Sequence, residues 1–164
     1  MTRPRALALI CSALIVTSVA AQTPVTLTVT GDVPAPLSLS PDAIKAMPRT
    51  RVATKGEDGQ TVTYEGVLVG EILKRAGATL GSDMRGNAVA TYVVASATDG
   101  YRAVFSLAEL DPAFTGSEII VADTIDGKPL GAHQGPLRIV APKDTRGARA
   151  VRMLERLEVV RLKK

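Results

Sequence analysis

Short apolar segments, separated by turns rich in Gly, Pro and Asp, constrain the fold of this chain more than any other feature. Val25–Thr30 alternates apolar and polar residues, which is typical of a strand with one buried face. Glu118–Ala122 and Leu137–Ala141 are continuous apolar runs of strand length, and Asp99-Gly100 and Asp126-Gly127 are strong turn signals. Predicted strands outnumber predicted helices, and the two do not alternate in a regular βαβ order. The sequence therefore predicts an α+β fold with mixed or antiparallel sheets.

Two helices can be predicted from their end signals. Ser40 is a good N-cap, Pro41 suits the first helical position, and a short helix over Ala43–Met47 would end before Pro48. A second helix is expected over Leu68–Arg75, with Gly77 just beyond it. Ser106–Leu110 can form one further turn of helix. The remaining predicted strands are Arg49–Thr54, Gln60–Tyr64, Val89–Ser96, Arg102–Phe105 and Met153–Leu162.

The first 21 residues have the pattern of a secretory signal peptide. A basic start, Met1–Arg5, precedes the apolar run Ala6–Ala20 and a small-residue exit. A membrane anchor is the alternative, but this run of about 15 residues is shorter than the roughly 20 that span a bilayer. We therefore expect residues 1–21 to be removed and residues 22–164 to form a single domain. That domain would be periplasmic, with no membrane span left after cleavage.

Composition excludes several functions. Apolar residues make up 46% of the chain and charged residues 22%, which excludes a disordered protein. Aromatic residues make up 3%, and removing the signal peptide lowers the net charge of +4 by two, so nucleic acid is not an expected partner. Cys11 and His133 are the only residues of their kinds, which excludes a Cys/His metal cluster. No nucleophile elbow or P-loop is present, and we assign neither catalytic nor metal-binding residues.

The polar residues concentrate in the segment from Gly131 to Arg152. Arg138 lies between Pro136 and Pro142 in an apolar strand, so its charge should be partly buried and must find a partner. That partner could be a ligand or an internal carboxylate. Guanidinium groups suit ligands with several oxygens because they give paired, charge-assisted hydrogen bonds. Lys143 and Arg146, by contrast, fit a solvated basic loop.

Five motifs give the chain a resemblance to a known family. Their residues, and their order along the chain, resemble those of the oxidoreductase molybdopterin-binding domain, which has the fold of the sulfite oxidase catalytic domain. The similarity extends over roughly residues 50–162. The motifs are Tyr64-Glu65-Gly66-Val67-Leu68-x-x-Glu71-Ile72-Leu73-x-x-Ala76-Gly77, Asp99-Gly100-Tyr101, Asp126-Gly127-Lys128-Pro129-Leu130, His133-x-Gly135-Pro136-Leu137-Arg138-Ile139-Val140-x-Pro142 and Gly147-Ala148-Arg149-x-Val151-Arg152.

The resemblance implies a pterin or molybdopterin cofactor and the residues that contact it. His133 and Arg138 would contact the pterin at the start of their strand. A turn with Arg152, where the family usually has Lys, would hold the pterin phosphate. Tyr101 would offer a face for stacking. The complete set of expected cofactor-binding residues is His133, Arg138, Arg149, Ala150, Val151, Arg152 and Tyr101.

One departure from the family decides between the possible functions. In the enzymes of the family a cysteine thiolate binds molybdenum, and the corresponding stretch here, Arg51–Gly56, has no cysteine. Our main hypothesis is therefore a periplasmic pterin-binding protein without redox catalysis, which could relay pterin occupancy to a membrane-bound signalling partner, such as a cyclic-di-GMP control enzyme. The alternative is a molybdopterin-dependent oxidoreductase of sulfite oxidase type that holds its metal without its own thiolate, or with a redox partner's. A third hypothesis is an interaction domain with a vestigial pocket.

Overall fold

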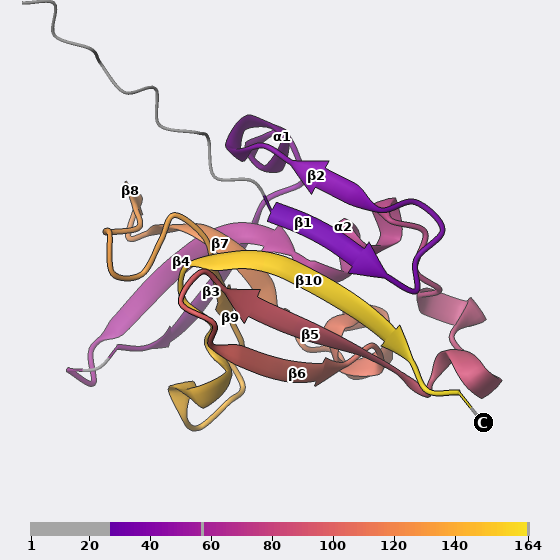
Figure 1. The fold of residues 1–164 in the computed structure, drawn as a ribbon. Helices are drawn as coiled ribbons and strands as arrows, with labels where there is room; N and C mark the ends of the chain where they lie inside the picture. Colours follow the sequence, from indigo (N-terminus) through magenta and orange to yellow (C-terminus); the bar gives the residue numbers. More distant parts are fainter. Residues whose placement is uncertain (1–26, 57, 164) are drawn as a thin grey trace, which may run out of the picture.

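Two five-stranded sheets and a few short helices make up the part of the protein that the structure, a computed structural model, describes (Figure 1). The structure describes residues 27–56 and 58–163. The predicted signal peptide lies outside these residues. The mixture of sheets and short helices confirms the predicted α+β fold. No helix in the described ranges has both the length and the apolar character needed to cross a membrane.

The first sheet has the strand order β2-β1-β10-β5-β6. Strands β1 (Leu27–Gly31) and β10 (Leu154–Arg161) pair in parallel, although they come from opposite ends of the chain. The other pairs are antiparallel and involve β2 (Leu37–Leu39), β5 (Thr91–Ala97) and β6 (Arg102–Ser106). One parallel pair among antiparallel ones makes this sheet mixed, as predicted.

The second sheet is antiparallel throughout. Strand β4 (Thr61–Leu68) pairs with β3 (Thr50–Lys55) on one side and with β7 (Ile120–Ile125) on the other. Strand β7 also pairs with β8 (Lys128–Pro129) and with β9 (Arg138–Val140). The turn between β7 and β8 is the predicted Asp126-Gly127, where both residues have positive φ, 47° and 76°.

The helices begin close to their predicted starts, but α1 ends at Lys45 rather than at Met47, and Leu68, predicted to be helical, is the last residue of β4. In α1 (Pro41–Lys45) the Ser40 side chain accepts a hydrogen bond from the Ala43 N–H at 3.2 Å, as expected of an N-cap. Helix α2 (Val69–Arg75) is followed by Gly77 with φ +80°. We did not predict α3 (Pro112–Thr115), which has four residues and depends on the cap by the buried Asp111. Within residues 27–56 and 58–163 there are also four single 3-10 turns, at Gly81–Asp83 (η1), Gly86–Ala88 (η2), Ala108–Leu110 (η3) and Gly147–Arg149 (η4).

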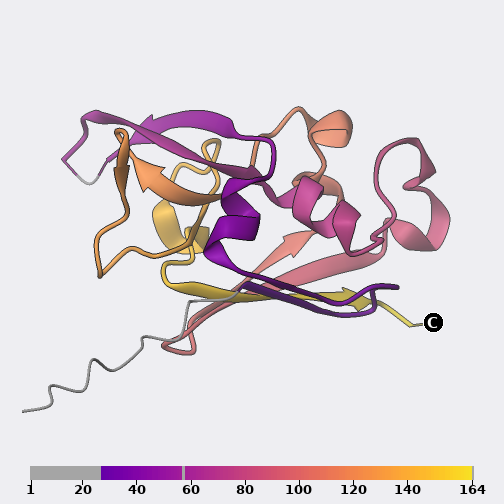
Figure 2. The same ribbon diagram turned by 90° about the horizontal axis from the view of Figure 1, so that it is seen from above.

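Helices α1 and α2 lie between the two sheets (Figure 2). Both contribute to the main core, α1 through Ile44 and α2 through Ile72 and Leu73, none of which is exposed. Val121 of β7 joins the same core from the second sheet. A smaller apolar cluster lies on the opposite face of the second sheet and consists of Val52, Tyr64, Ile120, Ala122 and Val140.

Candidate functional site

A cavity of about 850 Å³ lies against the second sheet, on the face that carries the smaller apolar cluster. Strands β3, β4, β7 and β9 supply one side of it. The loop that leaves β9 supplies much of the rest. The lining residues are Ala53, Thr54, Lys55, Gly56, Asp58, Thr61, Val62, Tyr64, Ile125, Gln134, Arg138, Val140, Ala141, Pro142, Asp144, Thr145, Arg146, Gly147, Ala150 and Arg152.

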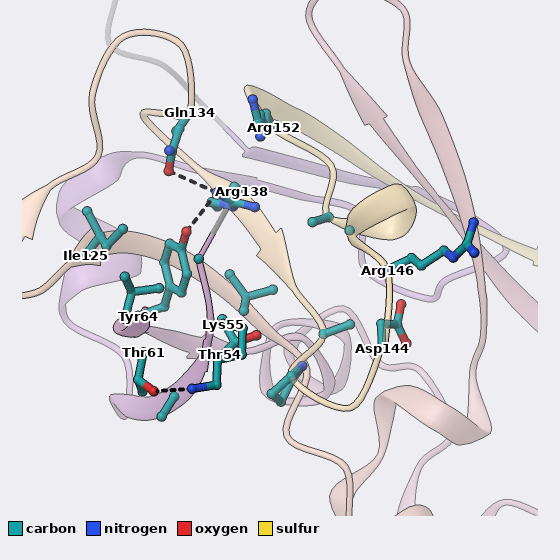
Figure 3. Close-up of a pocket in the computed structure, with 18 of the residues that line it drawn as sticks. Thr54, Lys55, Thr61, Tyr64, Ile125, Gln134, Arg138, Asp144, Arg146 and Arg152 are labelled. Carbon is teal, nitrogen blue, oxygen red and sulfur yellow. Dashed lines mark hydrogen bonds between the residues drawn. The ribbon is translucent and has the colours of Figure 1, made fainter. Parts of the chain in front are cut away.

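Arg138 is the most buried charged residue of this lining, at 7% exposure. Strand alternation places it on the cavity face of β9, together with Val140, while Ile139 between them faces the main core. Its Nη1 donates hydrogen bonds to Tyr64 Oη at 3.0 Å and to Gln134 Oε1 at 2.9 Å. Figure 3 shows both side chains converging on the guanidinium. Arg138 Cζ also lies 4.9 Å from the centroid of the Tyr64 ring, within cation–π range.

The described lining has more basic than acidic side chains. The basic ones are Lys55, Arg138, Arg146 and Arg152, and the acidic ones are Asp58 and Asp144. Both oxygens of Asp144 accept hydrogen bonds from Arg149, which does not line the cavity. The negative charge of Asp144 is therefore paired with a positive charge outside the cavity. Lys55 Nζ donates to the Thr61 hydroxyl at 3.1 Å, a neutral partner. This charge balance favours a ligand that carries negative charge.

The structure brings together three of the residues predicted to bind the cofactor. Arg138, Ala150 and Arg152 all line the cavity. His133 is exposed and does not line it, although its neighbour Gln134 does. Val151 is fully buried in the main core, and its carbonyl accepts a hydrogen bond from the Ile139 N–H at 2.8 Å.

Tyr101 and Arg149 also lie outside the cavity lining. Tyr101 is 49% exposed, and its hydroxyl donates a hydrogen bond to the Ala148 carbonyl. Arg149 donates to Asp144 and to Glu109, and its Cζ lies 4.8 Å from the centroid of the Phe105 ring. Its hydrogen bonds with Asp144, and then with Glu109, raise the pKa of the guanidinium above its ordinary value.

Tyr64, Gln134 and Lys55 are among the polar residues of the cavity that sequence reasoning missed. A signal for Tyr64 was present, because alternation along β4 places it on the same face as Val62, opposite the polar Glu65. Gln134 lies four residues before Arg138 in the polar segment, but only the fold shows that its side chain turns back to the guanidinium. For Lys55, the last residue of β3, we find no signal in the sequence.

The family of this chain follows from comparison with known proteins. The family model described as oxidoreductase molybdopterin binding domain matches residues 16–164. The chain belongs to this family. The match begins inside the predicted signal peptide, so the cleavage position stays a prediction. No curated protein matches the chain.

Solved structures with this fold include the sulfane dehydrogenase SoxCD from Paracoccus pantotrophus. The match has a TM-score of 0.64 at 18% sequence identity, and it covers 82% of this chain. At this identity the likeness shows the fold, which is the molybdopterin-binding fold that we predicted from the motifs. The chain spans only 37% of the SoxCD chain.

The cavity residues fit the organic part of a molybdopterin cofactor but not a metal bound through a protein thiolate. Guanidinium and ammonium groups can pair with a phosphate, and the buried Tyr64 and Val140 add apolar atoms to the wall of the cavity. At the cavity, strand β3 supplies the methyl and hydroxyl groups of Ala53 and Thr54 and the amine of Lys55, with no thiol among them. In the described part of the chain, no group of three or more His, Cys, Asp or Glu side chains could hold a metal ion.

Proposed function

We propose that this protein binds a pterin in the cavity beside Arg138 and does not itself catalyse a redox reaction. The observation that carries this proposal is the composition of the cavity wall. It combines a buried arginine, an aromatic ring and further basic residues, and its strand β3 has no thiol. Such a wall can orient a flat, negatively charged ligand, but it lacks the soft donor that an oxo-molybdenum centre takes from a protein.

Each group of the wall would have a separate role in binding. Tyr64 and Arg138 are already held in contact, so a ligand ring meets a surface that loses little side-chain freedom on binding. Arg146 and Arg152, on the loop after β9, would pair with the negative group of the ligand. When bound, molybdopterin would supply its ring and its phosphate to these groups.

We place this function in the periplasm, with a membrane-bound signalling partner that responds to pterin occupancy. The support for export is the basic and apolar pattern of residues 1–21. The signalling partner is part of the proposal and follows from the family resemblance alone. Protease accessibility in intact cells and after release of the outer membrane would test the location.

A second candidate is a molybdopterin-dependent oxidoreductase domain. It is favoured by the family match, which extends over residues 16–164 and carries the name of an oxidoreductase domain. In this case the sulfur that binds the metal would come from outside the described wall of the cavity. Metal content separates the two candidates.

The first experiment identifies what the protein carries. The full chain, with its own N-terminal segment, is produced in a bacterium that synthesises molybdopterin and is purified under mild conditions. We expect pterin fluorescence after oxidation and release, with molybdenum far below one atom per chain by mass spectrometry. About one molybdenum per chain would overturn the proposal in favour of the oxidoreductase. If the preparation carries no pterin, and added pterin-6-carboxylate (a fluorescent, anionic pterin) does not raise the melting temperature, the pocket is vestigial.

The second experiment tests the cavity itself. We expect Arg138→Ala to weaken binding of pterin-6-carboxylate by about tenfold to a hundredfold, because a hydrogen bond from a charged group contributes about 1.5–3 kcal/mol. Fluorescence titration measures the change. Arg156→Ala is the matched control, since Arg156 is exposed in the middle of the first sheet. If Arg138→Ala misfolds, Arg152→Gln at the exposed rim of the cavity serves in its place. Equal affinity of wild type and a folded Arg138→Ala variant would contradict the proposal.

A further inference from the structure

The loop over residues 141–152, which we call the cavity loop, joins the two sheets. It begins after β9 in the second sheet and leads to β10 in the first. It carries Asp144, Arg146 and Arg152, along with apolar parts of the cavity wall. The position of this loop therefore determines the shape and the charge of the site.

One side chain of the cavity loop fastens it to the first sheet. Arg149 donates from Nε and Nη2 to the two oxygens of Asp144, at 2.9 and 2.7 Å, within the loop. Its Nη1 donates to Glu109 Oε2 at 2.9 Å, on the 3-10 turn η3 that follows β6. The face of the guanidinium rests on Phe105 of β6, which is 1% exposed.

The far end of this attachment is held by hydrogen bonds of its own. Glu109 uses its other oxygen, Oε1, to accept a hydrogen bond from the Ser106 N–H at 2.7 Å, while the Glu109 N–H donates to Ser106 Oγ at 3.2 Å. The two residues thus hold each other at the start of η3, as in a capping box. A second attachment lies close by, where the Tyr101 hydroxyl donates to the Ala148 carbonyl.

These contacts leave Arg149 poorly suited to bind a ligand in the cavity. Its three side-chain nitrogens already donate to two carboxylates, and one ring covers a face of the guanidinium. If Arg149 turned toward a ligand, it would break its bidentate ion pair with Asp144, and such pairs are among the strongest polar contacts in proteins. It would also release Asp144 as a negative charge beside an anionic ligand.

We propose that Arg149 is a positioning residue: it holds the cavity loop in its binding shape by tying Asp144 to Glu109 and Phe105 of the first sheet, and it does not contact the ligand. This inference rests on the proposed function. It adds Glu109, Phe105 and Tyr101, none of which lines the cavity, to the residues on which binding depends.

The test compares variants at both ends of the attachment. Arg149→Lys keeps the positive charge but loses the planar guanidinium group. Glu109→Gln leaves Arg149 in place but removes the negative charge that Arg149 pairs with on η3. We expect Arg149→Lys to weaken pterin-6-carboxylate binding about tenfold through lost preorganisation, and Glu109→Gln to weaken it in the same direction. The double variant should bind no more weakly than Arg149→Lys alone, since both changes break one attachment. Arg156→Ala is again the control.

Hydrogen exchange supplies a readout that does not depend on the ligand. In the free protein, amides over residues 144–150 should exchange faster in Arg149→Lys, Glu109→Gln and Tyr101→Phe than in wild type, while those of β5 and β10 keep their rates. Direct ligand contact by Arg149 would give another pattern: Glu109→Gln would bind normally, and loop exchange would not change. That pattern would overturn the inference.

The failure of the proposed function can be recognised separately. If wild type binds no pterin-6-carboxylate while the variants still speed exchange in the loop, the attachment stands and the ligand assignment fails. If wild type binds and loop exchange is the same in all variants, the ligand assignment stands and the positioning role fails.

Discussion

At the scale of single residues, burial and partners give two arginines of one segment different roles. Arg138 is buried beside a cavity, with Tyr64 and Gln134 among its partners, so it can present charge to a ligand. Arg149 lies between two carboxylates and a buried ring, so its charge is used inside the protein. The side chains are chemically the same, and the difference comes entirely from what the fold places around them.

Thr91 offers a prediction about stability at this scale. It is 5% exposed at the start of β5, and its hydroxyl has no hydrogen-bond partner in the described structure. We expect Thr91→Val to raise the free energy of unfolding in urea by about 1 kcal/mol, because a methyl group of similar size replaces an unsatisfied buried hydroxyl. Thr91→Ser, which keeps the hydroxyl and removes the methyl, should instead lower it. A loss of stability in Thr91→Val would show that the hydroxyl is satisfied.

At the scale of elements, an ion cluster connects β3, β4 and β7 of the second sheet on the face away from the cavity. Arg49, just before β3, donates to Asp123 of β7 at 3.0 and 2.5 Å and to Glu65 of β4 at 3.3 Å. Arg51 of β3 also donates to Glu65, at 2.7 Å. Burial raises the pKa of Asp123, but its hydrogen bonds with Arg49 and Thr124 outweigh burial, so the net effect lowers the pKa. Hydrogen bonding from Arg51 is the largest cause of the lowered pKa of Glu65.

These shifts predict how stability depends on pH. A carboxyl group with a lowered pKa in the folded protein stabilises the fold above its ordinary pKa, here 3.8 for Asp and 4.5 for Glu. This contribution is lost as the pH falls through the lowered values, so the free energy of unfolding should decrease from about pH 5 toward pH 2. Urea titrations across this range measure it. Asp123→Asn should be less stable at pH 6 and should show a shallower dependence; an unchanged slope would exclude this cluster as a source of acid sensitivity.

At the scale of the whole molecule, one core serves both sheets. Leu27 and Leu157 of the first sheet, Val67 and Val121 of the second, and Ile72 of α2 are all at most 1% exposed and belong to the same cluster. Neither sheet can lose its partner without exposing this cluster to water. The two sheets should therefore unfold together.

Calorimetry tests this expectation. We expect a single thermal transition in which the calorimetric and van't Hoff enthalpies agree. Leu157→Ala, a core truncation in β10, should lower the free energy of unfolding by about 2–5 kcal/mol and shift the whole transition without splitting it. Two resolved transitions would mean that the sheets are separate folding units, and the single-domain prediction would then be wrong.

Much of the fold could be predicted from local signals. Alternation, the Asp-Gly turns and the caps at Ser40 and Gly77 depend on a few neighbouring residues, and the structure confirms each of them. Elements without a strong local pattern were missed. The two-residue strand β8 exists because it pairs with β7, and the short helix α3 exists because Asp111 is buried at its start.

What the sequence alone determined is the class of the protein. It specified the strands and turns, the family, a cysteine-free β3 and a buried charge at Arg138. Each strand, turn and motif depends on residues that are close together in the chain, and the order of these elements can be followed along the sequence. Only the tertiary structure decided which polar side chains meet at the cavity. Tyr64 and Arg138 are 74 positions apart, and Arg149 and Glu109 are 40 apart. Contacts between residues so far apart in sequence depend on how the two sheets pack, so they could not be predicted from local sequence patterns.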